Sequence, residues 1–167
     1  MRAAVAAIPE KHDGALDPRS SIRVWLRLLS CTVAIEKVIQ RRLAEGFNTS
    51  LARFDVLAAL DRHPEGMTMG ALSRSLLVSN GNTTQLIQKL AAEGLVQLAP
   101  GPKDRRSSVA RLTEAGEAHF RQLAEVHHGW VDELMGGLDA EAREHLLEAL
   151  NMLKTSIAAA TPVERNR

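Results

Sequence analysis

The chain has 167 residues, of which 45% are hydrophobic and 25% are charged, and its formal net charge is +1. This length accommodates one domain, or one small domain with an oligomerisation element, and the composition is that of an ordinary globular protein. Its single cysteine excludes an internal disulfide framework, and no run of about 18 apolar residues predicts a membrane span. We therefore expect a cytoplasmic protein with no membrane partner.

The first long helix is predicted from Ser20 or Ser21 to about Glu45, with Gly46 in the position that follows a helix end. Residues 1–19 are expected to form a flexible arm. The helix carries two apolar stripes, so most of its circumference is predicted to be buried. In so small a protein this favours contact with the chain's own core and also with a second subunit.

A second helix is predicted after Thr49 or Ser50, either of which is a suitable N-cap, and His63-Pro64 ends it. Gly66-Met67 suits a minimal strand. A short helix then follows from Thr68 to Leu76, and Val78-Ser79 forms a turn.

The next predicted helix, Asn80 to Glu93, has an unusual polar face. At about 100° per residue, one sector holds the apolar side and Thr83, which we expect to be buried. The opposite sector carries amides, a hydroxyl and a glycine, where a solvated helix usually carries Glu, Lys and Arg. The residues of this outer face and its flanks are Asn80, Gly81, Asn82, Thr84, Gln85, Gln88 and Lys89.

A basic hairpin follows this helix. Gly94 ends the helix, a strand runs through residues 95–98, and Pro100-Gly101-Pro102 opens a turn that carries Lys103, Asp104, Arg105 and Arg106. The returning strand is predicted from Ser108 to Leu112. Two more helices are expected, capped by Thr113 and Asp139 and separated by Gly136-Gly137. The order helix, helix, basic hairpin is that of a winged helix-turn-helix, and it indicates binding to duplex DNA.

The chemistry of these side chains fits DNA. Glutamine amides match the N6 and N7 edge of adenine in the major groove, so Gln85 and Gln88 are the predicted base readers, with Thr84 near a thymine methyl. Asn80 and Asn82 lie at a helix N-terminus that favours a phosphate, and Lys89 suits another phosphate. On the hairpin, Arg106 is predicted to enter the minor groove and Arg105 or Lys103 to contact phosphates, while Asp104 holds an arginine in place.

At this point the sequence resembles the MarR family of multiple-antibiotic-resistance-type regulators, from about Ser20 to Ile157. The resemblance is carried by residues 72–78, by residues 90–96, and by Asp104-Arg105-Arg106 with Leu112-Thr113-Glu114-Ala115-Gly116. The implied fold is mainly α with a small β wing: a winged helix-turn-helix plus N- and C-terminal dimerisation helices. The expected divisions are 1–19 (arm), 20–46 with 113–158 (dimerisation), 47–112 (DNA binding) and 159–167 (tail).

The resemblance also implies a homodimer on a palindromic operator, with half-sites about 10 bp apart. Members of the family are mostly repressors that small, often aromatic and anionic ligands release. An arginine near an aromatic wall would suit such a carboxylate. The candidate ligand residues are Arg23, Trp25, Arg27, Arg53, Phe54, His127 and Trp130. No cofactor and no metal site is expected.

Alternative interpretations rest on fewer residues. Cys31 suggests a redox-sensing regulator of the same fold, but it lies on an apolar stripe, where we expect a buried and unreactive thiol. His119, His127 and His128 lack the partners that complete a tetrahedral metal site. The chain shows no phosphate loop and no nucleophile elbow, so an enzyme is not expected. A winged-helix adaptor that binds only protein would show apolar anchors on the face from Asn80 to Lys89, and none is present.

Overall fold

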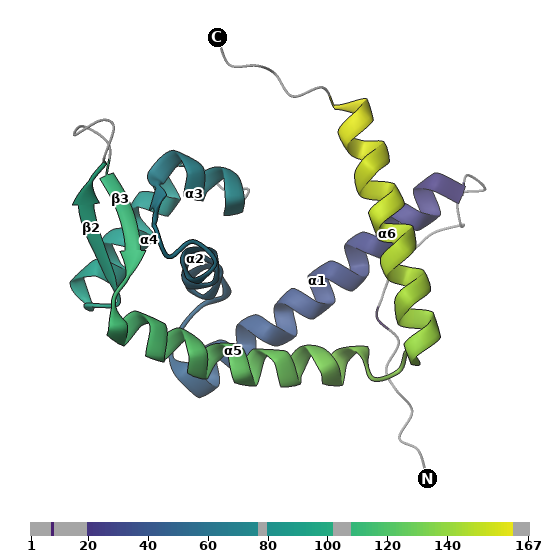
Figure 1. The fold of residues 1–167 in the computed structure, drawn as a ribbon. Helices are drawn as coiled ribbons and strands as arrows, with labels where there is room; N and C mark the ends of the chain where they lie inside the picture. The colour runs from purple at the N-terminus through teal and green to yellow at the C-terminus, as the bar shows by residue number, and fades with distance from the viewer. Residues whose placement is uncertain (1–7, 9–19, 77–79, 102–107, 162–167) are drawn as a thin grey trace. The chain divides into compact units, whose positions relative to one another are not determined.

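The computed structural model describes residues 8, 20–76, 80–101 and 108–161, and the chain forms two compact units, Met1–His128 and Gly129–Arg167. The described part is mainly helical with a small antiparallel sheet, as the sequence predicted (Figure 1). Its elements in chain order are α1 (Ser20–Phe47), α2 (Leu51–Asp61), β1 (Met67–Thr68), α3 (Met69–Leu76), α4 (Asn80–Ala92), β2 (Val96–Pro100), β3 (Ser108–Leu112), α5 (Glu114–Met135) and α6 (Ala140–Ala160).

The junction between α1 and α2 differs from the prediction. Helix α1 continues through Gly46 to Phe47, and the residue with a left-handed backbone is Asn48, at φ 48°. Asparagine tolerates this conformation because its short polar side chain bonds locally, so a glycine is not required here. Ser50 is the N-cap of α2, and its hydroxyl accepts a hydrogen bond from the Arg53 backbone N–H at 3.3 Å.

The core of the first unit gathers around α2. This helix is short, but most of its residues from Phe54 to Leu60 are buried. The largest fully buried side chains around it come from every helix of the unit: Leu43, Leu57, Leu60, Leu72, Ile87, Leu90 and Leu123. Because α2 is enclosed in this way, it is the element against which α3 and α4 are held.

The sheet has the strand order β1-β3-β2, and both pairings are antiparallel. Residues Val96 to Pro100 of β2 pair with Leu112 to Ser108 of β3, and β1 pairs with the other edge of β3 through Met67↔Ala110. Val96, Val109 and Ala110 are buried, so one face of this small sheet closes the core. The strand β1 leads directly into α3, which joins the sheet to the helix pair.

A close contact joins the sheet to α5. The Thr113 hydroxyl donates to the Gly94 carbonyl at 2.7 Å and accepts from the Gly116 N–H at 3.0 Å, so Thr113 caps α5 as predicted. A β-carbon on Gly116 would overlap the Leu95 carbonyl oxygen, far inside van der Waals contact. The sequence Leu-Thr-Glu-Ala-Gly therefore ends in glycine because the backbone of another segment passes directly over that position.

The second unit contains the end of α5 and all of α6. Asp139 is the N-cap of α6, as predicted, and its carboxylate accepts from the Ala142 N–H at 2.8 Å. No residue of α6 is buried, and large apolar side chains such as Leu147, Met152 and Ile157 are exposed. Among the described residues, no helix is long and apolar enough to cross a membrane.

Candidate nucleic-acid interface

The helix pair α3 and α4 is joined by a buried polar contact. The Ser73 hydroxyl donates to the Thr83 hydroxyl at 2.9 Å, and both residues are buried at 5% and 0% exposure. Thr83, Ile87 and Leu90 form the buried side of α4, as the periodicity predicted, whereas Leu86, predicted to be buried with them, is half-buried. The connection at residues 77–79 lies outside the described residues.

The outer face of α4 carries most of the predicted base-reading residues. Asn82, Gln85, Gln88 and Lys89 are exposed, and Thr84 is half-buried. Asn80 begins the helix, but its side chain is outside the described part of the structure. Helix α4 therefore presents amides, and no large apolar side chain, at the centre of its exposed face. Its opposite side is buried at Thr83, Ile87 and Leu90. The exposed face has the donors and acceptors that base edges require.

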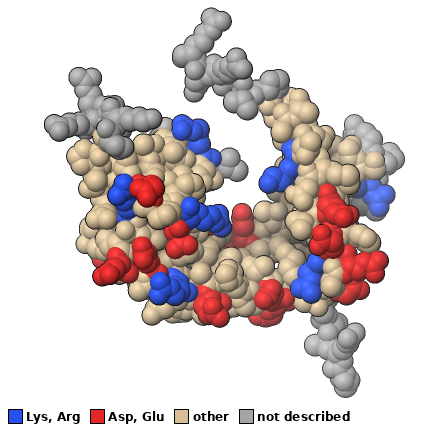
Figure 2. All heavy atoms as spheres, viewed as in Figure 1, with Lys and Arg blue, Asp and Glu red and all other residues tan. Residues whose placement is uncertain are grey.

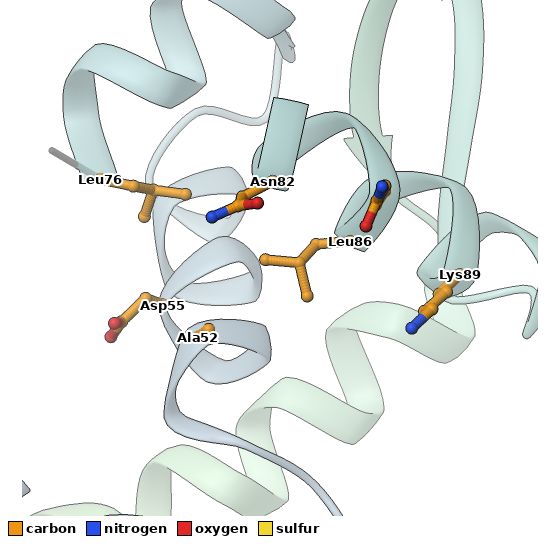
Figure 3. Close-up of a pocket in the computed structure, with 7 residues that line it drawn as sticks. Ala52, Asp55, Leu76, Asn82, Leu86 and Lys89 are labelled. Carbon is orange, nitrogen blue, oxygen red and sulfur yellow. The ribbon is translucent and has the colours of Figure 1, made fainter. Parts of the chain in front are cut away.

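One flank of this face borders a cavity of about 320 Å³, lined by Ala52, Asp55, Leu76, Asn82, Gln85, Leu86 and Lys89. Asn82 and Leu86 project from α4 toward α2, which contributes Ala52 and Asp55 to the lining (Figure 3). Burial raises the pKa of Asp55, and the nearby Glu36 carboxylate raises it further, while Arg62 acts in the opposite direction. Asp55 was not among the predicted site residues, because no sequence pattern near it indicates that α4 packs beside this part of α2.

The wing is partly described. Strands β2 and β3 pair antiparallel as far as Pro100 and Ser108. The predicted contacts of the wing, Lys103, Asp104, Arg105 and Arg106, lie outside the described residues. Arg111 belongs to β3 and has a structural role, because its Nε donates to the Glu65 carbonyl oxygen at 2.7 Å. The Arg111 side chain is 43% exposed, so this hydrogen bond lies at the surface.

The charge distribution also distinguishes the surfaces. Acidic side chains gather along the edge of the molecule where α5 runs (Figure 2). On this helix Glu114, Glu117 and Glu125 are exposed. Like charge repels phosphate, so this edge is unsuited to DNA, whereas α4 contributes Lys89 in its last turn and no acid within its bounds.

The predicted ligand residues fall in several places. Phe54 is buried, and His127 stacks on it with ring centroids 4.4 Å apart. Burial lowers the pKa of His127, and the neighbouring His128 lowers it further. Arg53 does not extend beside these rings as a free cation, because its guanidinium forms a bidentate pair with Glu93. Trp130 belongs to the second unit.

The remaining candidates lie in the first turns of α1. Arg23, Trp25 and Arg27 are exposed, with Trp25 at 58%. Cys31 is also exposed, so the expectation of a buried thiol is wrong for the single chain. The apolar stripes of α1 extend beyond what the first unit's core covers, and Cys31 lies on that uncovered part. Within the described ranges, no group of three or more His, Cys, Asp or Glu side chains is arranged to hold a metal ion.

A short helix pair with an exposed amide face, followed by a hairpin that packs on the same core, defines a winged helix-turn-helix DNA-binding protein. Comparison with known proteins identifies the family: a model described as MarR family matches residues 47–107. The transcriptional activatory protein BadR of Rhodopseudomonas palustris is 32% identical over 144 residues, which cover 83% of this chain and 81% of BadR. The chain belongs to the MarR family of DNA-binding transcriptional regulators.

Solved structures agree with this assignment. A MarR family regulator from Silicibacter pomeroyi is 32% identical and superposes with a TM-score of 0.71, covering 82% of this chain and 94% of that one. A mutant of MarR from E. coli, crystallised with operator DNA, has a TM-score of 0.70 at 24% identity, with coverage of 82% and 98%. At that identity the second comparison bears on the fold alone.

Proposed function

We propose that this protein is a homodimeric repressor that binds a palindromic operator and is released from it by a small ligand. The observation that carries the proposal is the exposed face of α4, where Gln85 and Gln88 lie opposite the buried Thr83 and Ile87. That arrangement, on a MarR-family fold, suits a helix lying in the major groove. The E. coli MarR mutant that shares this fold was crystallised with operator DNA. We propose no catalytic activity, and a cytoplasmic location, where a regulator of this family meets its DNA.

The dimer is supported by apolar surface on the terminal helices. Val24 and Trp25 of α1 are 54% and 58% exposed, and Leu147, Met152 and Ile157 of α6 are 53%, 69% and 53% exposed. Large exposed apolar patches mark interaction sites. We therefore assign residues 20–46 and 113–158 to dimerisation and residues 47–112 to DNA binding. A twofold-symmetric pair of winged units then reads half-sites about 10 bp apart.

The proposal is tested by selecting duplexes that bind the purified protein from a random pool at near-physiological salt. Enrichment of one palindrome supports a dimeric reader of specific DNA. Retention that is weak, depends on salt and shows no sequence preference contradicts it, because phosphate contacts alone account for such binding. Sedimentation of Leu147→Asp tests the dimer independently: we expect a monomer, whereas the exposed-site control Arg143→Asp stays dimeric.

One observation favours a second candidate function, activation of transcription. BadR, at 32% identity, is named an activatory protein. Activation and repression by the same DNA-binding unit differ in where the operator lies relative to the promoter. Transcription in vitro from a promoter that carries the selected palindrome distinguishes them: a repressor lowers transcript yield, and an activator raises it.

A further inference from the structure

The C-terminal end of α4 is the point where the helix with the amide face joins the wing. Glu93 directly follows the helix, and strand β2 begins directly after Leu95. Gly94 has a left-handed backbone, at φ 75°, and the Leu95 N–H donates to the Leu90 carbonyl at 2.9 Å. These are features of a Schellman helix end, whose hydrogen bonds hold the backbone. The Glu93 side chain therefore projects from a backbone position that is well fixed.

From this end of α4, Glu93 reaches across to α2. Arg53 Nη1 donates to Glu93 Oε1 at 2.8 Å, and Nη2 donates to Glu93 Oε2. Two parallel bonds between a planar guanidinium and a planar carboxylate fix a direction as well as a distance. The Arg53 side chain is only 19% exposed, so its neighbours hold it in place. The hydrogen bonds from Arg53 lower the pKa of Glu93 and outweigh the opposing effect of burial, so this carboxylate stays ionised.

Neither charge of the pair suits its own helix. Arg53 lies in the first turn of α2, and Glu93 lies at the C-terminal end of α4. The helix dipole favours acidic side chains at an N-terminus and basic side chains at a C-terminus, which is the opposite arrangement. The two charges are favourable only because the helix ends meet in the folded chain. Their role is therefore to join two helices, and neither stabilises its own helix.

A second polar contact holds the other half of α4. The buried hydroxyl of Ser73 donates to that of Thr83 at 2.9 Å and ties the helix to α3. Gln85 and Gln88 lie in the chain between Thr83 and Glu93, so the proposed base readers stand between two fixed points. Side chains that recognise a partner by hydrogen bonds need such support, because small shifts of their base misalign the bonds.

We propose that Arg53 is a positioning residue for DNA recognition. Through Glu93 it fixes the C-terminal half of α4 against α2, and thereby sets the direction in which Gln85 and Gln88 meet the base edges. Because β2 begins a few residues after Glu93, the same tie orients the first strand of the wing relative to the helix. Arg53 acts without touching DNA, since Glu93 already pairs with its guanidinium. This inference deepens the proposed function and rests on it, because it needs sequence-specific reading by α4.

The test uses the opposite charges of the two residues. Arg53→Gln removes a positive charge and Glu93→Gln removes a negative one, so by charge alone the first weakens and the second strengthens binding to any DNA. The measured quantity is the ratio of affinities for the selected operator and for a random duplex of the same length, from fluorescence anisotropy at one salt concentration. Charge effects largely cancel in this ratio. We expect both variants to lower it by about three- to tenfold, the loss of a partly exposed, bidentate ion pair.

Three further variants are controls. The double variant Arg53→Gln with Glu93→Gln should lower the ratio no further than either single variant, because residues that act as one pair are not additive. Arg121→Gln and Glu125→Gln, at exposed positions of α5, change the charge by the same amounts and should leave the ratio unchanged. Thermal unfolding shows that each variant is folded at the temperature of the binding measurement. If Arg53→Gln does not fold, Glu93→Gln and its control Glu125→Gln carry the test.

The proposal is wrong if the folded single variants keep the wild-type ratio, since the ion pair then contributes to stability alone, or if the two losses are additive. If the wild type itself selects no operator, the proposed function fails, and the positioning is decided in the free protein. Amide hydrogen exchange of residues 84–95 should then be faster in both single variants and unchanged in the α5 controls. Exchange as slow as in the wild type would refute the positioning independently of DNA.

Discussion

The hydroxyl of Ser73 donates to the hydroxyl of Thr83 at 2.9 Å, and this contact joins α3 to α4 in a place that water does not reach. The two residues are ten apart in the chain, so the bond fixes how the second helix is oriented against the first. A polar contact in this position orients α4 more narrowly than apolar packing alone, because its geometry allows few alternatives.

We expect Thr83→Val to lower the free energy of unfolding by about 1–3 kcal/mol, because the Ser73 hydroxyl then stays buried without this partner. The double variant Ser73→Ala with Thr83→Val should recover part of that loss. Urea unfolding of the two single variants and the double variant checks this. Strictly additive losses would show that the two hydroxyls do not interact.

Gly116→Ala is expected to destabilise the protein by about 1–3 kcal/mol or more, because its methyl group would overlap the Leu95 carbonyl and force the backbone to shift. Gly129→Ala is the matched control on the same helix. It meets open space there, so it should gain up to about 1 kcal/mol from helix propensity. Thermal unfolding of both variants at one protein concentration makes the comparison. Equal stability of the two would contradict the close approach.

Gln85→Ala and Gln88→Ala are each expected to relax base preference at one position per half-site, by about 1–3 kcal/mol. Non-specific affinity should remain, since phosphate contacts supply it. Binding to a set of operators that differ at single base pairs measures this. Gln122→Ala, an exposed amide on α5, serves as the control, and its base preferences should match the wild type. Unaltered preferences in both α4 variants would refute the assignment of this face.

Arg106→Ala should weaken operator binding strongly, because a guanidinium on the wing is predicted to enter the narrow minor groove of an A/T-rich segment. The loss should be smaller on operators whose flanks are changed to G·C pairs. Fluorescence anisotropy with both kinds of operator measures the difference. Undiminished affinity would remove Arg106 from the interface.

The stacked pair of Phe54 and His127 predicts a pH dependence of stability. Burial, and then the charge of His128, lowers the pKa of His127 in the folded protein. The unfolded chain therefore binds protons first, and this group costs stability as the pH falls below about 6.5. His127→Phe keeps the stack and should lose less stability between about pH 7 and pH 5. The exposed His145→Gln should follow the wild type, and identical pH profiles for wild type and His127→Phe would contradict the prediction.

Local sequence patterns were sufficient to predict the helices and strands, and to distinguish the buried side of α4 from its exposed side. The period of the apolar residues placed Thr83 and Ile87 inside and Gln85 outside, because a helix repeats every few residues whatever lies around it. For the same local reason Asp139 was identified as a cap, and Ser50 was one of two candidates for the cap of α2.

Contacts between distant segments were not predictable in this way. Arg53 and Glu93 are 40 residues apart, and no local pattern shows that the end of α4 lies beside the start of α2. The hydrogen bond from Arg111 to the Glu65 carbonyl likewise joins residues 46 apart. The exposure of Cys31 depends on which side of α1 the core covers, and an apolar stripe does not reveal that.

Strand β1 has only the residues Met67 and Thr68, but it pairs with β3 and continues without a break into α3. The sheet and the helix pair therefore belong to the same compact unit. The DNA contacts proposed for α4 and for the wing would then act like the two arms of a chelating ligand. Once one arm is bound, the other is held at a high effective concentration, and the entropy of immobilising the protein is lost only once.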